Sequence, residues 1–203
     1  MTITISHLYD SYAEAQNAVR SLESAGVPHT NISIVANNSD GWFDGKKDRD
    51  GDGVDDRAEA AGTGAGLGAG LGGAAGLLAG LGLLAIPGLG PVVAAGWLAA
   101  TAVGAAAGAA TGGLVGALTE AGVAKEDAPL YAEGVRRGGA LVSAKVNETD
   151  QARLEALMSP SSVNLNDRRV AWEKSGWSGY DPAGQPYDAA GVQRERELYV
   201  RSR

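Results

Sequence analysis

The feature that most constrains the fold is a run of 60 residues without a charged side chain, from Ala60 to Thr119. All 17 basic and 24 acidic residues of the 203-residue chain therefore lie in its flanks. Within the run, glycine recurs every fourth residue from Gly64 to Gly80, with leucine and alanine between. Glycine costs a water-exposed helix about 1 kcal/mol relative to alanine, so its concentration here indicates close backbone packing away from water.

The run divides at the sequence IPGLGP, Ile86 to Pro91, where two prolines and two glycines favour a turn. On each side, about 26 residues are long enough for a helix of roughly 39 Å. We therefore predict a helical hairpin of the glycine-zipper type, whose small residues form packing and oligomerisation surfaces. These residues are Gly64, Gly68, Gly72, Gly76 and Gly80 in the first half, and Gly96, Gly104, Gly108, Gly112 and Gly116 in the second.

Two settings would keep such a hairpin from water. A span of about 20 residues crosses a bilayer, and basic residues near the open ends would place both termini in the cytoplasm, with the hairpin in a bacterial inner membrane. The alternative is a cytoplasmic chain whose hairpin is buried between subunits of a soluble or filamentous oligomer. A disordered linker and a silk-like strand, suggested by GTGAGLGAG, are less favoured interpretations.

The two flanks read as halves of one small domain. In the N-terminal half, Ile3 and Ile5 alternate in a strand, Ser11 and Glu14 form a capping-box pattern, and NISIVA is a second strand. In the C-terminal half, EDAPLYAEGVRRGG predicts a helix and GALVSAKV a strand, followed by a short helix and a weak strand near Val163 and Leu165. Segments of about 40 residues seldom fold alone, so the halves are expected to meet.

We therefore predict an α+β fold: a small split α/β sandwich of order β-α-β … α-β-α-β, interrupted by the hairpin and followed by a partly disordered tail. The expected segments are residues 1–40 and 120–166 for the split domain, 41–59 for an acidic loop, 60–119 for the hairpin, and 167–203 for a polar tail containing aromatic residues.

The acidic loop contains DRDGDGVDDRAE, which fits the pattern of a calcium-binding loop. Calcium prefers six to eight oxygen ligands, which this spacing wraps around one centre. The predicted ligands are Asp48, Asp50, Asp52, Val54 through its carbonyl, Asp56 and Glu59. A solvated acidic linker is the alternative, because no amphipathic helix precedes the loop.

Other site signals are weak. The net charge of -7 argues against nucleic-acid binding, and the chain has no cysteine. Gly68, Gly70 and Gly73 fit a dinucleotide-binding pattern without the strand it needs, so no organic cofactor or small-molecule substrate is predicted. His7 and His29 are expected in a strand and a loop, and no group of residues predicts catalysis.

Four segments carry a family likeness: SYAEAQNAVRSLESAGV, NISIVAN, DDRAEAAGTGAG and LTEAGVAKEDAPLYAEGVRRGGALVSAKV. With them, the chain resembles the general stress protein 17M-like (heat-induced stress protein) domain family, in a variant with a glycine-zipper insertion. This resemblance implies a bacterial stress protein without assigned catalysis or site residues. We therefore expect a non-enzymatic, self-associating stress-response protein anchored in the membrane by its hairpin; the alternative is an oligomeric scaffold that responds to calcium.

Overall fold

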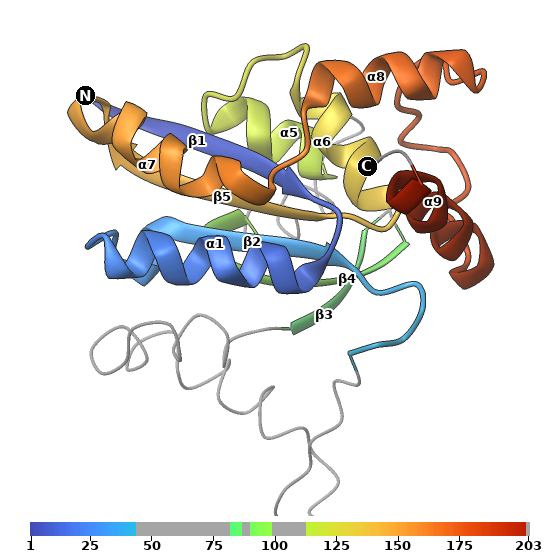
Figure 1. Ribbon diagram of the computed structural model, residues 1–203, viewed down its shortest axis with the longest axis horizontal. Helices are drawn as coiled ribbons and strands as arrows, with labels where there is room; N and C mark the ends of the chain where they lie inside the picture. Colours follow the sequence, from blue (N-terminus) through green and yellow to red (C-terminus); the bar gives the residue numbers. More distant parts are fainter. Residues whose placement is uncertain (44–81, 87–89, 99–112, 202–203) are drawn as a thin grey trace, which may run out of the picture.

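The computed structural model describes residues 1–43, 82–86, 90–98 and 113–201. These residues form both helices and strands (Figure 1). The strands are β1 (Thr2–Tyr9), β2 (Ile32–Asn37), β3 (Gly82–Ile86), β4 (Gly90–Gly96) and β5 (Ala140–Asn147). The helices are α1 (Tyr12–Ser24), α5 (Gly113–Glu120), α6 (Ala128–Arg136), α7 (Gln151–Met158), α8 (Leu165–Lys174) and α9 (Ala189–Arg201). Short 3₁₀ turns cover His29–Asn31, Glu148–Asp150 and Ser159–Ser161.

The strands form a single antiparallel sheet in the order β1-β5-β2-β4-β3. Strand β5, from the C-terminal flank, lies between β1 and β2, so both flanks contribute to the same sheet. Its register aligns Ala144 with Ile5 on one side and with Ile32 on the other. The α+β fold class predicted from the sequence is confirmed.

The N-terminal flank folds as its local pattern predicts. The Ser11 hydroxyl accepts a hydrogen bond from the Glu14 backbone N–H at 3.2 Å and donates one to the Glu14 carboxylate at 3.1 Å. This side-chain cap satisfies a backbone donor at the start of α1. The buried face of α1 consists of Ala15, Ala18, Val19 and Leu22, which recur at helical spacing.

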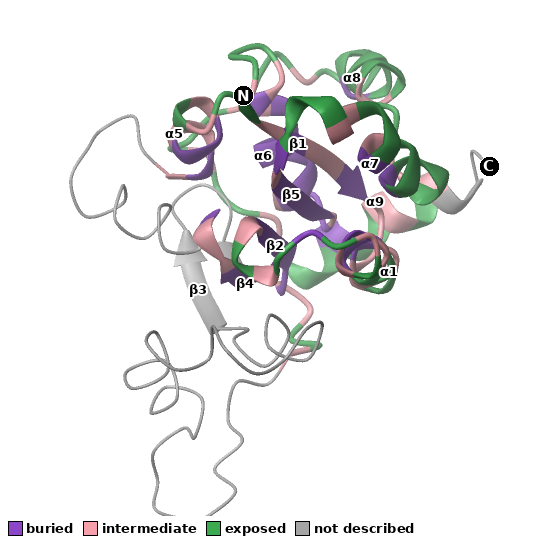
Figure 2. Cartoon of the chain, turned by 90° about the vertical axis from the view of Figure 1, so that its left-hand side faces the viewer, coloured by how far each residue is buried: buried purple, intermediate pink, exposed green. Residues whose placement is uncertain are grey.

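Helices cover both faces of the sheet, giving three layers (Figures 1 and 2). On one face, α1 and α7 pack on strand residues such as Ile5, Ile34 and Val142. On the other, α5 and α6 pack on Leu8, Val35 and Leu141. The alternation of strand side chains between the two faces therefore feeds two apolar cores, one on each side of the sheet.

The middle of the uncharged run differs from the prediction. Residues 82–85 and 92–96 are predicted to be helical, and Ile86 to Pro91 to form a turn, but residues 82–86 and 90–96 form the strand pair β3–β4, and β4 also pairs with β2. Val92 and Val93 are fully buried, one in each core. Valine is stiff at χ1 and packs well on a pleated surface, and pairing with β2 adds hydrogen bonds that a helix wheel does not reveal.

The end of β4 is fixed by polar contacts within the sheet. The Ser33 hydroxyl donates to the Ala95 carbonyl at 2.8 Å and accepts from the Leu98 backbone N–H at 3.2 Å. Gly96 has a φ of +85°, and a Cβ atom there would lie 2.8 Å from the Ser33 Cα. Gly96 is thus required by a strand end that approaches its neighbour closely, and its predicted role in helix packing is wrong.

The tail also differs from the prediction. Residues expected to be partly disordered form α8 and α9, which lie at one end of the sheet (Figure 1). Trp172 and Val192 are buried. The predicted last strand is absent from the described residues: Val163 makes one backbone hydrogen bond, donating to the Leu8 carbonyl at 2.7 Å, and Leu165 begins α8.

None of the helices in the described residues combines the length and the apolar character that crossing a bilayer requires.

Candidate functional site

The predicted calcium ligands, Asp48 through Glu59, lie outside the described residues. In the part of the chain that the structure describes, no three acidic or histidine side chains gather in a way that could hold a metal ion. Calcium binding by the acidic loop stays a prediction.

The predicted packing glycines fall in two groups. Gly64, Gly68, Gly72, Gly76, Gly80, Gly104, Gly108 and Gly112 lie outside the described residues. Gly116 lies in α5, where it is half-buried. Its role in self-association stays a prediction.

An ionic cluster lies at the end of the sheet where α8 and α9 dock. We call it the arginine corner. It contains four carboxylates and four guanidinium groups: Asp10, Asp40, Glu133, Arg136, Arg137, Arg168, Glu195 and Arg196.

The fold gathers the arginine corner from distant parts of the sequence. Asp10 and Asp40 follow β1 and β2, two strands that run in the same direction and so end at the same side of the sheet. Glu133, Arg136 and Arg137 come from the last turn of α6 and the residue after it. The tail supplies Arg168 from α8, and Glu195 and Arg196 from α9.

Each tail residue of the arginine corner forms an ion pair with an oppositely charged residue of the domain. Arg168 contacts Asp10 at 2.9 Å, Arg196 contacts Asp40 at 2.5 Å, and Arg137 forms an ion pair with Glu195. Glu133, whose side chain is 0% exposed, forms ion pairs with both Arg136 and Arg137. Because a buried charge without a partner is strongly destabilising, the corner requires its charges to be matched.

Aromatic rings surround the guanidinium groups. Arg137 lies 5.0 Å from the centre of the Trp172 ring and 5.3 Å from that of Tyr187, and Arg168 lies 3.4 Å from the centre of the Tyr199 ring. These distances suit cation–π attraction. The Trp172 indole N–H donates to the Tyr199 hydroxyl, which in turn donates to Glu195 at 2.6 Å. The rings and charges thus link α8 to α9.

Glycines in the sequence GVRRGG allow the tail and β1 to approach. A Cβ atom on Gly138, whose φ is +108°, would lie 2.5 Å from the Val192 side chain. A Cβ atom on Gly134 would lie 2.9 Å from the Leu8 Cδ1 atom. The missing side chains of Gly134 and Gly138 therefore allow β1 and α9 to pack closely against this turn.

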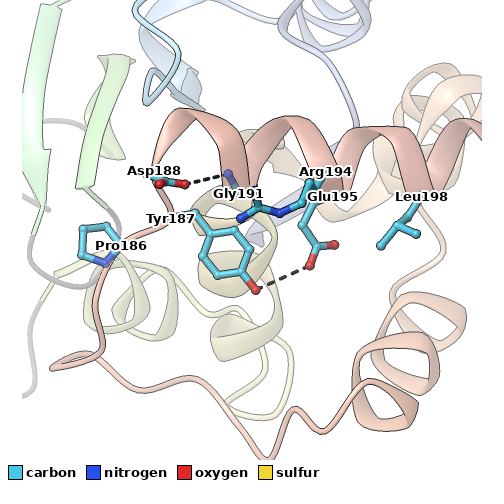
Figure 3. A pocket seen from close by; sticks show the side chains of 7 residues that line it. All are labelled: Pro186, Tyr187, Asp188, Gly191, Arg194, Glu195 and Leu198. Carbon is cyan, nitrogen blue, oxygen red and sulfur yellow. Dashed lines mark hydrogen bonds between the residues drawn. The ribbon is translucent and has the colours of Figure 1, made fainter.

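An open depression lies beside α9 and is lined by Tyr187, Glu195 and Leu198 among others (Figure 3). Asp188 caps this helix, because its carboxylate accepts from the Gly191 backbone N–H at 2.7 Å. Burial raises the pKa of Tyr187, with the charge of Arg137 opposing that shift. Burial, and next the hydrogen bond to Glu195, raise the pKa of Tyr199 to about 12. Both phenols therefore stay protonated near neutral pH and serve as hydrogen-bonding groups.

The chemistry of the arginine corner is that of a docking interface. Each of its carboxylates forms an ion pair with a guanidinium group. Such pairing holds helices in register.

Sequence reasoning predicted a helix over Glu133, Arg136 and Arg137 but missed their role. The spacing of Glu133 three and four residues before the two arginines was a signal for ion pairs on one helix face. No local pattern indicated the partners in the tail, which are 58 residues away in the case of Arg137 and Glu195. His7 lies in β1, as predicted, whereas His29 begins a 3₁₀ turn where a loop is predicted.

Residues 4–82 match the family model of the heat induced stress protein YflT domain. Comparisons with curated proteins and with solved structures found no match. The family match confirms the resemblance to general stress proteins that the sequence suggested, and does not address the glycine-zipper variant. The matched segment contains Asp10 and Asp40, whereas the other members of the arginine corner follow it in the chain.

Proposed function

We propose that this relative of heat-induced stress proteins is a non-enzymatic stress-response scaffold, in which copies of the chain associate through the edge of the sheet formed by β3. The observation that carries the proposal is the position of β3. It is the last strand of the sheet, and among the described strands it pairs with β4 alone.

An edge strand presents unpaired backbone groups that another chain can join. Proteins commonly protect such edges with charged residues, with proline or with a covering segment. Strand β3 has the sequence GLLAI, without charge or proline. Two copies related by a two-fold axis can pair β3 with β3 in antiparallel orientation, which would join two sheets into one.

The strands also favour the scaffold over the membrane hairpin. A bilayer-crossing hairpin needs two spans of about 20 residues each. Strands β3 and β4 and helix α5 take residues 82–86, 90–96 and 113–120 from this part of the chain. The uncharged residues outside the described structure are then 60–81, 87–89 and 99–112, and the last of these segments is shorter than the roughly 20 residues of a span.

The test is a charge placed on the β3 edge. Leu83→Lys and Leu84→Lys place a lysine on opposite faces of the strand, so that at least one variant is expected to fold. Thr2→Lys adds the same charge to the β1 edge as a matched control. Multi-angle light scattering on the full chain should show association in the wild type and in Thr2→Lys, and loss of it in a folded β3 variant. A wild type that is monomeric, or a folded β3 variant that still associates, would contradict the proposal.

Carbonate washing of membranes separates the two locations. The scaffold is expected in the wash. Retention in the washed membrane, in both the wild type and the β3 variants, would favour the membrane-anchored alternative at the bacterial inner membrane.

A further inference from the structure

We infer that α9 is a releasable clamp, which holds the loop where the chain leaves β2 for the segment that leads to β3. The loop runs from Asn37 to Phe43, and the next 38 residues of the chain separate it from β3. The clamp is a conformational device of the monomer and operates whether or not the chain self-associates.

Two side chains of α9 reach the loop directly. Arg196 donates to the Asp40 carboxylate at 2.5 Å, and Gln193 donates to the same carboxylate at 3.4 Å. Arg196 also donates to the Gly138 carbonyl at 3.0 Å, next to the start of β5. One arginine therefore ties the loop after β2 to the turn before β5.

The loop is ordered by its own hydrogen bonds, which Asp40 joins to α9. The Asn37 backbone N–H donates to the Gly139 carbonyl at 3.1 Å, and the Asn38 side chain accepts from the Phe43 N–H at 2.9 Å. The Trp42 indole N–H donates to the Asn37 carbonyl at 2.7 Å. Loss of the Asp40–Arg196 contact is therefore expected to loosen the whole loop, because the hydrogen bonds that order the loop lie within a few residues of Asp40.

The contacts of α9 favour a helix that can detach from the domain. Among the side chains of α9 that the structure describes, Val192 is the buried apolar one, whereas the other contacts described above are ionic or hydrogen-bonded. Within the described structure, the second carboxylate oxygen of Asp40 and the Nε of Arg196 are buried without a hydrogen-bond partner. Buried polar groups without partners reduce the net gain from docking. The helix also follows residues 175–188, a connection without helix or strand that allows it to move away.

Hydrogen exchange on the full chain tests the clamp. In Arg196→Gln, the amides of residues 37–43 should exchange about tenfold faster, because the charge-assisted hydrogen bonds of Arg196 to Asp40 and Gly138 are lost. The matched control is Arg194→Gln, which removes the same charge from an exposed position of α9 and should leave the loop unchanged. Because coupling is reciprocal, Asp40→Asn should speed exchange in α9.

Each outcome decides the inference. Faster loop exchange in Arg196→Gln but not in Arg194→Gln, together with faster α9 exchange in Asp40→Asn, supports the clamp. Exchange that changes only within α9 in Arg196→Gln overturns it, and so does an equal effect of the control. Deletion of residues 189–203 provides a second variant, in which the loop should exchange at least as fast as in Arg196→Gln.

Discussion

The two edge strands of the described sheet, β1 and β3, differ in the residues that surround or form them. At β1, the Thr4 hydroxyl donates to the Ala121 carbonyl, Val163 donates to the Leu8 carbonyl, and Arg168 pairs with Asp10 just after the strand. At β3, an uncharged strand ends the described sheet. The C-terminal flank thus covers the β1 edge with polar and ionic contacts, whereas the uncharged run supplies the strand at the other edge of the described sheet.

The largest effect on stability is expected when the buried charge of the arginine corner, Glu133, is removed. Glu133→Gln leaves Arg136 and Arg137 without their shared buried counter-charge, and should lower the free energy of unfolding by about 3 kcal/mol. Urea denaturation followed by circular dichroism measures the change. Glu197→Gln, at an exposed position of α9, is the control, with an expected change within about 0.5 kcal/mol. Equal stability of the two variants would show that the corner is not what holds this side together.

A smaller effect is expected where the tail meets the domain. Gly138→Ala combines an unfavourable positive φ with a contact against Val192, and should cost about 2 kcal/mol. Gly176→Ala is the matched control, because Gly176 also has a positive φ of +94°, but a Cβ atom added there would have no neighbour within 4 Å. It should cost about 1 kcal/mol. Thermal unfolding of both variants checks the difference, which would vanish if α9 did not dock on Gly138.

The smallest effect concerns alkaline pH. The folded chain holds the proton of Tyr199 up to a pKa of about 12, whereas the unfolded chain releases it near the ordinary value of 10. Stability that is present below pH 10 is therefore lost as the pH rises from 10 towards 12. Tyr199→Phe should show a shallower loss over this window in denaturation midpoints. An identical slope in the two proteins would mean that Tyr199 is not held in the corner.

The fold was predictable from the sequence where local pattern and tertiary packing agree. Ile3 and Ile5, the Ser11–Glu14 cap and the apolar face of α1 indicated their strand and helix directly. The uncharged run misled the interpretation at Val92 and Val93. Glycine spacing favoured helix packing there, whereas partners on β2 selected a strand.

The arginine corner was less predictable for a related reason. The helix with Glu133, Arg136 and Arg137 follows from local sequence, but pairing with Glu195 or stacking on Trp172 depends on how the tail folds back. The tail is polar overall, and its anchors are single residues, Trp172 and Val192, separated by a connection that has no helix or strand. Such isolated anchors leave no periodic signal.

Disulfide trapping on the full chain tests the open edge most directly, because the native sequence contains no cysteine. Cysteine is placed singly at Leu83, Leu84 or Ala85 of β3, and at Thr2 of β1 as the control. If β3 pairs with β3 across a two-fold axis, one β3 position brings two copies within disulfide range, and mild oxidation yields a covalent dimer. The account predicts a dimer from one of the β3 positions and none from the β1 position. A chain that stays monomeric at every β3 position, or that crosslinks equally well through β1, would contradict it.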